Sequence, residues 1–171
     1  GEVSTARWDV VEQASDAVTL RTPARLPLVL ERRMRLEGDR PILRIEESVR
    51  ADADVTVPFL WGHHPAFTAT DGARIDLPEG VIVDVDAAHA PPFGDLAAGG
   101  RGAWPHVPGR PDAGPVALDR IGQGPTERLA FLSGFGDGTW AAIRGIAPGL
   151  GVAMAWDART FPGAWFWWEI G

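Results

Sequence analysis

Residues 28–49 have the sequence LVLERRMRLEGDRPILRIEESV, in which apolar and charged side chains alternate along two runs. Arg32 and Glu47 are the two charged exceptions on the apolar faces of these runs. Between the runs lies EGDRP at 37–41, where Gly permits a positive φ and Pro restricts its own φ, as a turn requires. The pattern predicts an antiparallel hairpin with one buried face. Its apolar positions are Leu28, Leu30, Met34, Leu36, Leu43, Ile45 and Val49.

Short alternating runs recur to the end of the chain, and no segment longer than about ten residues keeps a helical period free of Gly or Pro. The fold class expected is therefore all-β, a β-sandwich. With 171 residues and 45% hydrophobic content, the chain is long enough for one sizeable core, so a single domain over residues 1–171 is expected. Further strands are expected at 17–22, 55–60, 74–77, 81–85, 128–132, 139–145, 151–156 and 164–170.

Residues 87–127 interrupt this series of alternating runs, because they are rich in Pro and Gly and show little apolar periodicity. Such a long connection is usually functional or disordered. The segment contains His89, Trp104 and His106, so one interpretation is a lid over a pocket, supported by the aromatic residue in Ala103-Trp104-Pro105-His106. The other interpretation, which the composition favours, is a surface excursion that the sheet tolerates.

Composition excludes several functions. All sixteen basic residues are Arg, and the net charge is -7, which disfavours nucleic acid as a partner. The absence of Cys excludes a disulfide scaffold and a thiolate nucleophile or ligand. No run of about 20 apolar residues is present to span a membrane, and no signal peptide is visible, so a cytoplasmic location is expected. We see no ligand cluster for a metal, and no cofactor is expected.

The stretch WGHHPAF at 61–67 places two adjacent histidines between aromatic side chains, after the apolar run at 55–60. An imidazole gains or loses a proton near neutral pH, so it suits proton transfer. Pro65 restricts His64 to extended geometry and ends strand pairing. Exposed imidazoles beside indole and phenyl faces are typical of a site for a sugar or another small polar ligand, with Trp61 and Phe67 as substrate-binding candidates. The alternative is that both histidines cap a strand and pack against Trp61.

The C-terminal strand expected at 164–170 carries three Trp residues within four positions. Alternation sends Trp165, Trp167 and Glu169 to one face of the strand and the intervening side chains to the other. The C–H faces of a pyranose stack on indole rings, and a neighbouring carboxylate accepts hydroxyl hydrogens. These three residues are therefore predicted as a sugar platform, with a sandwich core and Glu169 at its rim as the equal alternative.

The run PFLWGHHPAF at 58–67, followed by DGARIDLP at 71–78, resembles the central region of the aldose 1-epimerase (galactose mutarotase-like) family. In that family a strand ends in an Asn-His-x-Tyr-Phe type motif whose His is the general acid. The chain is most similar to the divergent branch in which Gly-His-His-Pro replaces Asn-His. Position by position, the Asn, His, Tyr and Phe of the motif fall on His63, His64, Ala66 and Phe67.

This resemblance implies a segment of a larger two-sheet β-supersandwich and an isomerase that interconverts the α and β anomers of a free sugar. It implies His64 as the catalytic acid and His63 as a substrate-binding neighbour. The family's catalytic Glu lies in a later strand that has no counterpart before Gly171, and Glu169 does not match it. The resemblance therefore implies an internal or truncated portion, whose unpaired strand edges would favour homo-oligomers.

Two other function classes remain open. A carbohydrate-binding β-sandwich without turnover explains the Trp platform and requires no catalytic base. A polysaccharide lyase or hydrolase can use the same fold. Hydrolysis is disfavoured, because no convincing pair of carboxylates can be assigned to the two sides of a glycosidic bond. The expected partner is a small-molecule sugar, an aldose.

Overall fold

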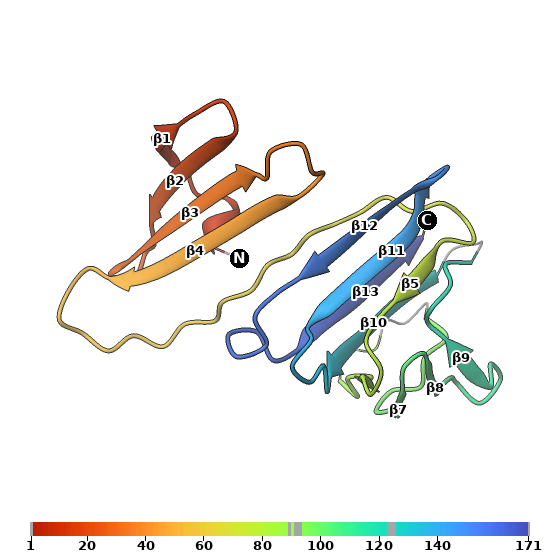
Figure 1. The fold of residues 1–171 in the computed structure, drawn as a ribbon. Helices are drawn as coiled ribbons and strands as arrows, with labels where there is room; N and C mark the ends of the chain where they lie inside the picture. The colour runs from red at the N-terminus through yellow and green to blue at the C-terminus, as the bar shows by residue number, and fades with distance from the viewer. Residues whose placement is uncertain (1, 89, 91–93, 123–125, 171) are drawn as a thin grey trace. The chain divides into compact units, whose positions relative to one another are not determined.

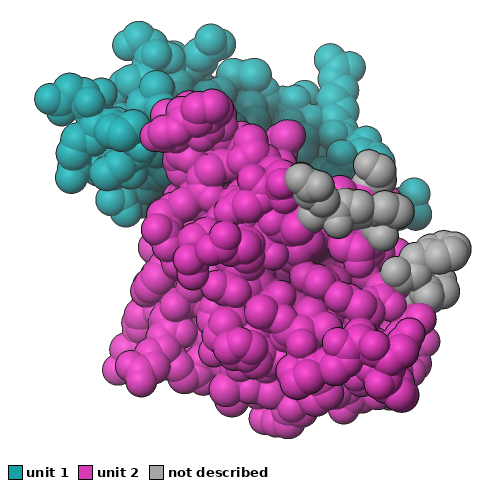
Figure 2. All heavy atoms as spheres, turned by 90° about the vertical axis from the view of Figure 1, so that its right-hand side faces the viewer, with its two compact units in different colours: residues 1–61 teal, residues 62–171 magenta. Residues whose placement is uncertain are grey.

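A computed structural model describes residues 2–88, 90, 94–122 and 126–170, and its secondary structure is almost entirely antiparallel β. This confirms the expected all-β class. The chain divides into two compact units, Gly1–Trp61 and Gly62–Gly171, which are coloured separately in Figure 2. We describe each unit by itself, and a single domain across the whole chain stays a prediction. Among the described residues, no helix is long and apolar enough to cross a membrane.

Unit 1 contains a four-stranded antiparallel sheet in the order β1-β2-β3-β4 (Figure 1). The expected hairpin forms its second half, where Leu28 pairs with Ala51 and Leu36 with Leu43. Gly38 adopts a φ of 58° in the connecting turn, a conformation that costs glycine little. The elements of this unit are the 3-10 helix η1 (Glu2–Ser4) and the strands β1 (Asp9–Gln13), β2 (Ala17–Pro23), β3 (Leu28–Leu36) and β4 (Leu43–Ala51).

The face of this hairpin that alternation predicted to be buried is buried only in part. Leu28 is buried, but Leu36, Leu43 and Ile45 are exposed. The prediction of one buried face is therefore wrong for the turn end of the hairpin. The described part of unit 1 has one sheet, so no second sheet of the same unit covers this face.

Unit 2 contains a four-stranded sheet in the order β13-β10-β6-β7, a three-stranded sheet β12-β11-β5 and the hairpin β8-β9. Figure 1 shows these strands with their connections. Besides the two strands of the hairpin, seven of the eight further strands expected from the sequence occur here or in unit 1, with ends shifted by a few residues at most. The strands of unit 2 are β5 (Arg74–Asp76), β6 (Ile82–Asp84), β7 (Arg101–Ala103), β8 (His106–Pro108), β9 (Pro115–Ala117), β10 (Thr126–Ser133), β11 (Trp140–Ala147), β12 (Leu150–Ala155) and β13 (Ala164–Ile170).

One hydrophobic core joins the sheets of unit 2 in a sandwich-like arrangement. Phe166 and Trp168 of β13 enter it from the four-stranded sheet, as alternation predicts. Ile75 of β5 and Val107 of β8 enter it from the smaller sheets. Each large apolar side chain buried in this way contributes about 1.5–3 kcal/mol of favourable transfer free energy.

Residues 87–127 do not form the uninterrupted loop that their composition suggested. The short strands β7, β8 and β9 lie within this segment. Leu96, Val107, Val116 and Leu118 are all buried in the core. Trp104 packs edge-on against Phe166, with ring centroids 5.8 Å apart. The described part of the segment therefore contributes side chains to the core rather than forming a lid or a surface excursion, and His89 lies outside the described residues.

The strand expected at 55–60 is absent. Residues 52–73 have no strand pairing and run as a long connection between β4 and β5 (Figure 1). The apolar side chains Val55, Phe59 and Leu60 are exposed. Pro58 lacks a backbone N–H, which removes a donor from the middle of the run. The histidines therefore follow an unpaired segment, not a strand end.

Candidate functional site

The two adjacent histidines contact different aromatic rings. The His63 ring lies edge-on to Phe161, with centroids 5.9 Å apart and planes at 85°. The His64 ring lies 5.8 Å from the Trp167 ring at a tilt of 40°. Successive side chains of an extended segment point in opposite directions, and Pro65 disfavours helical geometry at His64. The two rings therefore have different partners, and His64 contacts the Trp-rich strand β13.

Strand β13 has one buried and one exposed face. Phe166 and Trp168 are buried, whereas Trp165 is 74% exposed, Trp167 is 52% exposed and Glu169 is exposed. The alternation expected from the sequence is therefore confirmed. The alternative in which both faces of this strand belong to the core is wrong, because two large indole rings remain accessible.

The neighbouring strand β10 completes this exposed surface. Its register places Glu127 opposite Glu169, Leu129 opposite Trp167 and Phe131 opposite Trp165. Directly opposed residues of an antiparallel pair share a face of the sheet. We call these six residues the aromatic face. It consists of Glu127, Leu129 and Phe131 on β10 and Trp165, Trp167 and Glu169 on β13.

Two contacts hold the indole rings of the aromatic face. The Trp165 ring lies edge-on to Phe131, with centroids 5.1 Å apart and planes at 87°. The Trp167 Nε1–H donates a hydrogen bond to Glu127 Oε1 at 3.2 Å. Glu127 is a residue that sequence reasoning missed, together with Phe131 and Phe161. Glu127 and Phe131 are revealed only by the pairing register of β10 with β13, two strands that lie more than thirty residues apart in the sequence.

The opposite side of the β10–β13 pair is fixed by a charged and aromatic cluster. The Arg128 guanidinium lies 4.3 Å from the Trp168 ring centroid. It also donates two hydrogen bonds to Asp95, at 2.8 and 2.6 Å. These bonds hold the pKa of the Asp95 carboxyl below its ordinary value, because they stabilise the charged form. This ion pair ties the segment before β7 to β10 and so supports the aromatic face from behind.

Trp61 and Phe67 are the two other aromatic residues predicted for the site. Trp61 belongs to unit 1, where its Nε1–H donates to Glu47 Oε2 at 2.9 Å. Phe67 belongs to unit 2 and is 38% exposed, and its ring contacts no aromatic ring among the described residues. Of the seven residues predicted for the site, the structure thus brings together His64, Trp165, Trp167 and Glu169.

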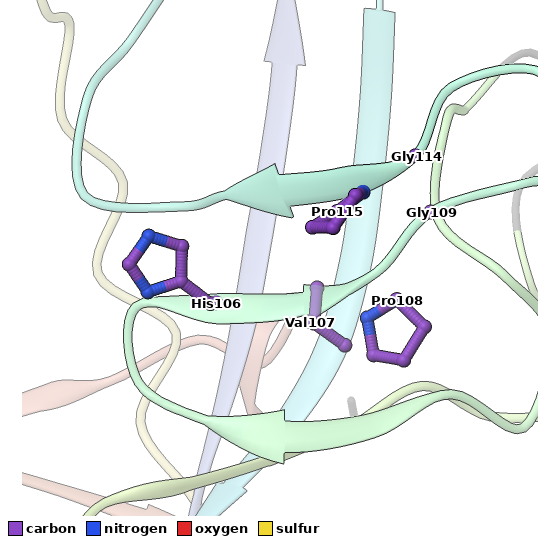
Figure 3. A pocket seen from close by; sticks show the side chains of 6 residues that line it. All are labelled: His106, Val107, Pro108, Gly109, Gly114 and Pro115. Carbon is purple, nitrogen blue, oxygen red and sulfur yellow. The ribbon is translucent and has the colours of Figure 1, made fainter.

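A shallow hollow elsewhere in unit 2 shares no residue with the aromatic face. Its volume is about 410 Å³. Figure 3 shows it on the β8–β9 hairpin, where its lining is apolar apart from the His106 imidazole. No group of three or more metal-ligating side chains occurs among the residues that the structure describes. The lining residues are His106, Val107, Pro108, Gly109, Gly114 and Pro115.

The aromatic face and His64 combine three chemical capacities. The indole rings offer flat apolar surfaces, the carboxylates of Glu127 and Glu169 accept hydrogen bonds, and the His64 imidazole carries two ring nitrogens for hydrogen bonding. Comparison of the chain with family models, curated proteins and solved structures finds no match. These side chains and the sequence resemblance are therefore the basis on which a function is proposed below.

Proposed function

We propose that this protein binds a free aldose on the aromatic face and interconverts its anomers, as an aldose 1-epimerase-like isomerase. The observation that carries the proposal is the contact between the His64 ring and Trp167 on an exposed strand. A pyranose stacked on an indole presents its ring oxygen and hydroxyls at the edge of the stack. The imidazole beside that indole is the group of the site best suited to transfer a proton there.

The reaction opens and recloses the sugar ring. His64 donates a proton to the ring oxygen while a base removes the proton of the anomeric hydroxyl, so the C1–O5 bond breaks and a carbonyl forms. Rotation about the C1–C2 bond and reclosure on the other carbonyl face return both protons and give the opposite anomer. Glu169 is the first choice for the base within this chain. Its carboxylate makes no hydrogen bond or ion pair with a described residue, so both oxygens can accept from a hydroxyl.

Polarimetry of freshly dissolved α-D-glucose and α-D-galactose tests this proposal. We expect the wild-type protein to accelerate mutarotation, and His64→Ala to reduce the protein-dependent rate about 100-fold or more, because the variant lacks the acid. His106→Ala is the matched control, since His106 lies on β8 outside the aromatic face. A rate equal to the spontaneous background with the wild-type protein would contradict the proposal.

A second candidate function is carbohydrate binding without turnover. The observation that favours it is the openness of the aromatic face, where Trp165 is three-quarters exposed. A binding surface requires stacking and hydrogen bonds but no acid–base pair. Saturation-transfer NMR with the same sugars distinguishes the two functions. Sugar contact at the Trp side chains without acceleration of mutarotation supports binding alone, and His64→Ala then lowers the affinity only modestly.

A further inference from the structure

Glu127 is the charged residue of the aromatic face to which the proposed chemistry gives no role. It lies at the start of β10, directly opposite Glu169, and its side chain reaches diagonally to Trp167. Diagonal partners across an antiparallel pair are within reach of long side chains. The indole Nε1–H thus has a carboxylate acceptor at 3.2 Å although the ring is half exposed.

Two contacts define the orientation of the Trp167 ring. One is the hydrogen bond to Glu127 at its pyrrole edge, and the other is the His64 ring 5.8 Å from its centroid. An indole has two rotatable side-chain bonds, and an exposed ring populates several rotamers unless contacts select one. The hydrogen bond is directional, so of the two contacts it is the one that selects an orientation of the ring. Its loss would leave His64 packed against a ring with no fixed orientation.

We propose that Glu127 is a positioning residue, which holds the Trp167 indole in the orientation that receives His64 and the sugar. Its importance for sugar chemistry rests on the proposed function, whereas the orientation of the ring does not. Glu127 acts through its acceptor oxygen. A neutral side chain with an oxygen at the same place therefore preserves the arrangement, and an apolar side chain of similar size destroys it.

The test compares Glu127→Gln with Glu127→Leu in the full chain. Ring currents of Trp167 displace the NMR resonances of the His64 ring protons, which are assigned by their disappearance in His64→Ala. Trp167→Ala gives the position without the indole. We expect Glu127→Leu to move the resonances more than halfway toward that position, and Glu127→Gln to leave them near the wild-type position. Glu79→Leu, which removes an exposed turn carboxylate, is the control.

Mutarotation in the same variants gives the second readout. We expect roughly a tenfold loss in Glu127→Leu and near-complete rescue in Glu127→Gln, because misorientation of a site group impairs proton transfer. Unmoved His64 resonances in Glu127→Leu, or equal displacement in both variants, would overturn the role of Glu127. If the resonances follow the expected pattern while the wild-type protein accelerates no sugar, the proposed function fails and the positioning of Trp167 stands.

Discussion

Arg32 and Glu47 illustrate at the level of single residues how a pattern and its exceptions arise. Each interrupts an otherwise apolar face, and the register of β3 and β4 places them directly opposite one another. Their side chains form an ion pair in which Glu47 is largely buried. Arg32 also lies over the Trp8 ring, and Glu47 accepts the Trp61 indole N–H. Arg32 and Glu47, the two charged exceptions in the alternating pattern, therefore pair with each other, and each also contacts an indole ring.

This arrangement predicts that the single variant Glu47→Leu is less stable than the double variant Arg32→Leu/Glu47→Leu. Glu47→Leu leaves the Arg32 charge and the Trp61 N–H without this acceptor, and we expect a loss of about 1–3 kcal/mol in stability. The double variant Arg32→Leu/Glu47→Leu restores an unbroken apolar face and should recover the part of that loss that comes from the unpaired Arg32 charge. Amide hydrogen exchange of β3 and β4 measures the change in opening free energy in both variants.

The control for this pair is Glu46→Leu, which removes an exposed carboxylate from the other face of β4 and should change stability by no more than about 0.5 kcal/mol. A double variant as unstable as Glu47→Leu would show that the ion pair does not determine the change in stability.

Trp61 is predicted as a sugar-binding residue from its neighbours in sequence. Its partner Glu47 is fourteen positions away and was not visible in that motif.

The same limit applies to the candidate site. Alternation alone predicted that Trp165 and Trp167 share a face opposite Trp168, and the exposed fractions confirm it. It could not identify Glu127, because the register between β10 and β13 depends on the whole core beneath them. Non-local pairing is not encoded in any short motif.

At the level of elements, the sequence predicted strands well where alternation extends over five residues or more. It failed at 55–60, where an apolar run has no pairing partner, and at 101–117, where strands of three residues are too short to show a period. It also missed β1, because DVVEQ at 9–13 shows no apolar alternation. Gly and Pro at 101–117 suggested a loop. The structure shows instead that Gly109 permits close packing, since a Cβ there would lie 2.1 Å from Gly114 O.

We therefore expect Gly109→Ala to destabilise unit 2 by about 2 kcal/mol, because the added methyl group forces the β8–β9 hairpin apart. Urea unfolding monitored by circular dichroism measures this change in the free energy of unfolding. Gly122→Ala is the matched control, because no atom lies within 4 Å of the added Cβ, and it should be tolerated. Equal stability of Gly109→Ala and Gly122→Ala would contradict the close packing of the β8–β9 hairpin at Gly109.

At the level of the whole molecule, composition and alternation sufficed for the all-β class but not for the division into two units. The break at Trp61/Gly62 falls inside the histidine motif, so residues that are adjacent in sequence belong to different units. The aromatic face with His64 lies entirely within unit 2, and its chemistry can therefore be argued from that unit alone. The central claim is that His64 and the aromatic face act as one sugar site.

A double-mutant cycle on sugar affinity tests that claim most directly. NMR titration with D-glucose and D-galactose gives dissociation constants for the wild-type protein, His64→Ala, Trp167→Ala and the double variant. Trp140→Ala, which removes a partly exposed indole on β11, is the control. We predict that both single variants weaken binding and that their effects are less than additive, with a coupling of about 0.5 kcal/mol or more. Strictly additive effects, or affinities unchanged by both substitutions, would contradict the account.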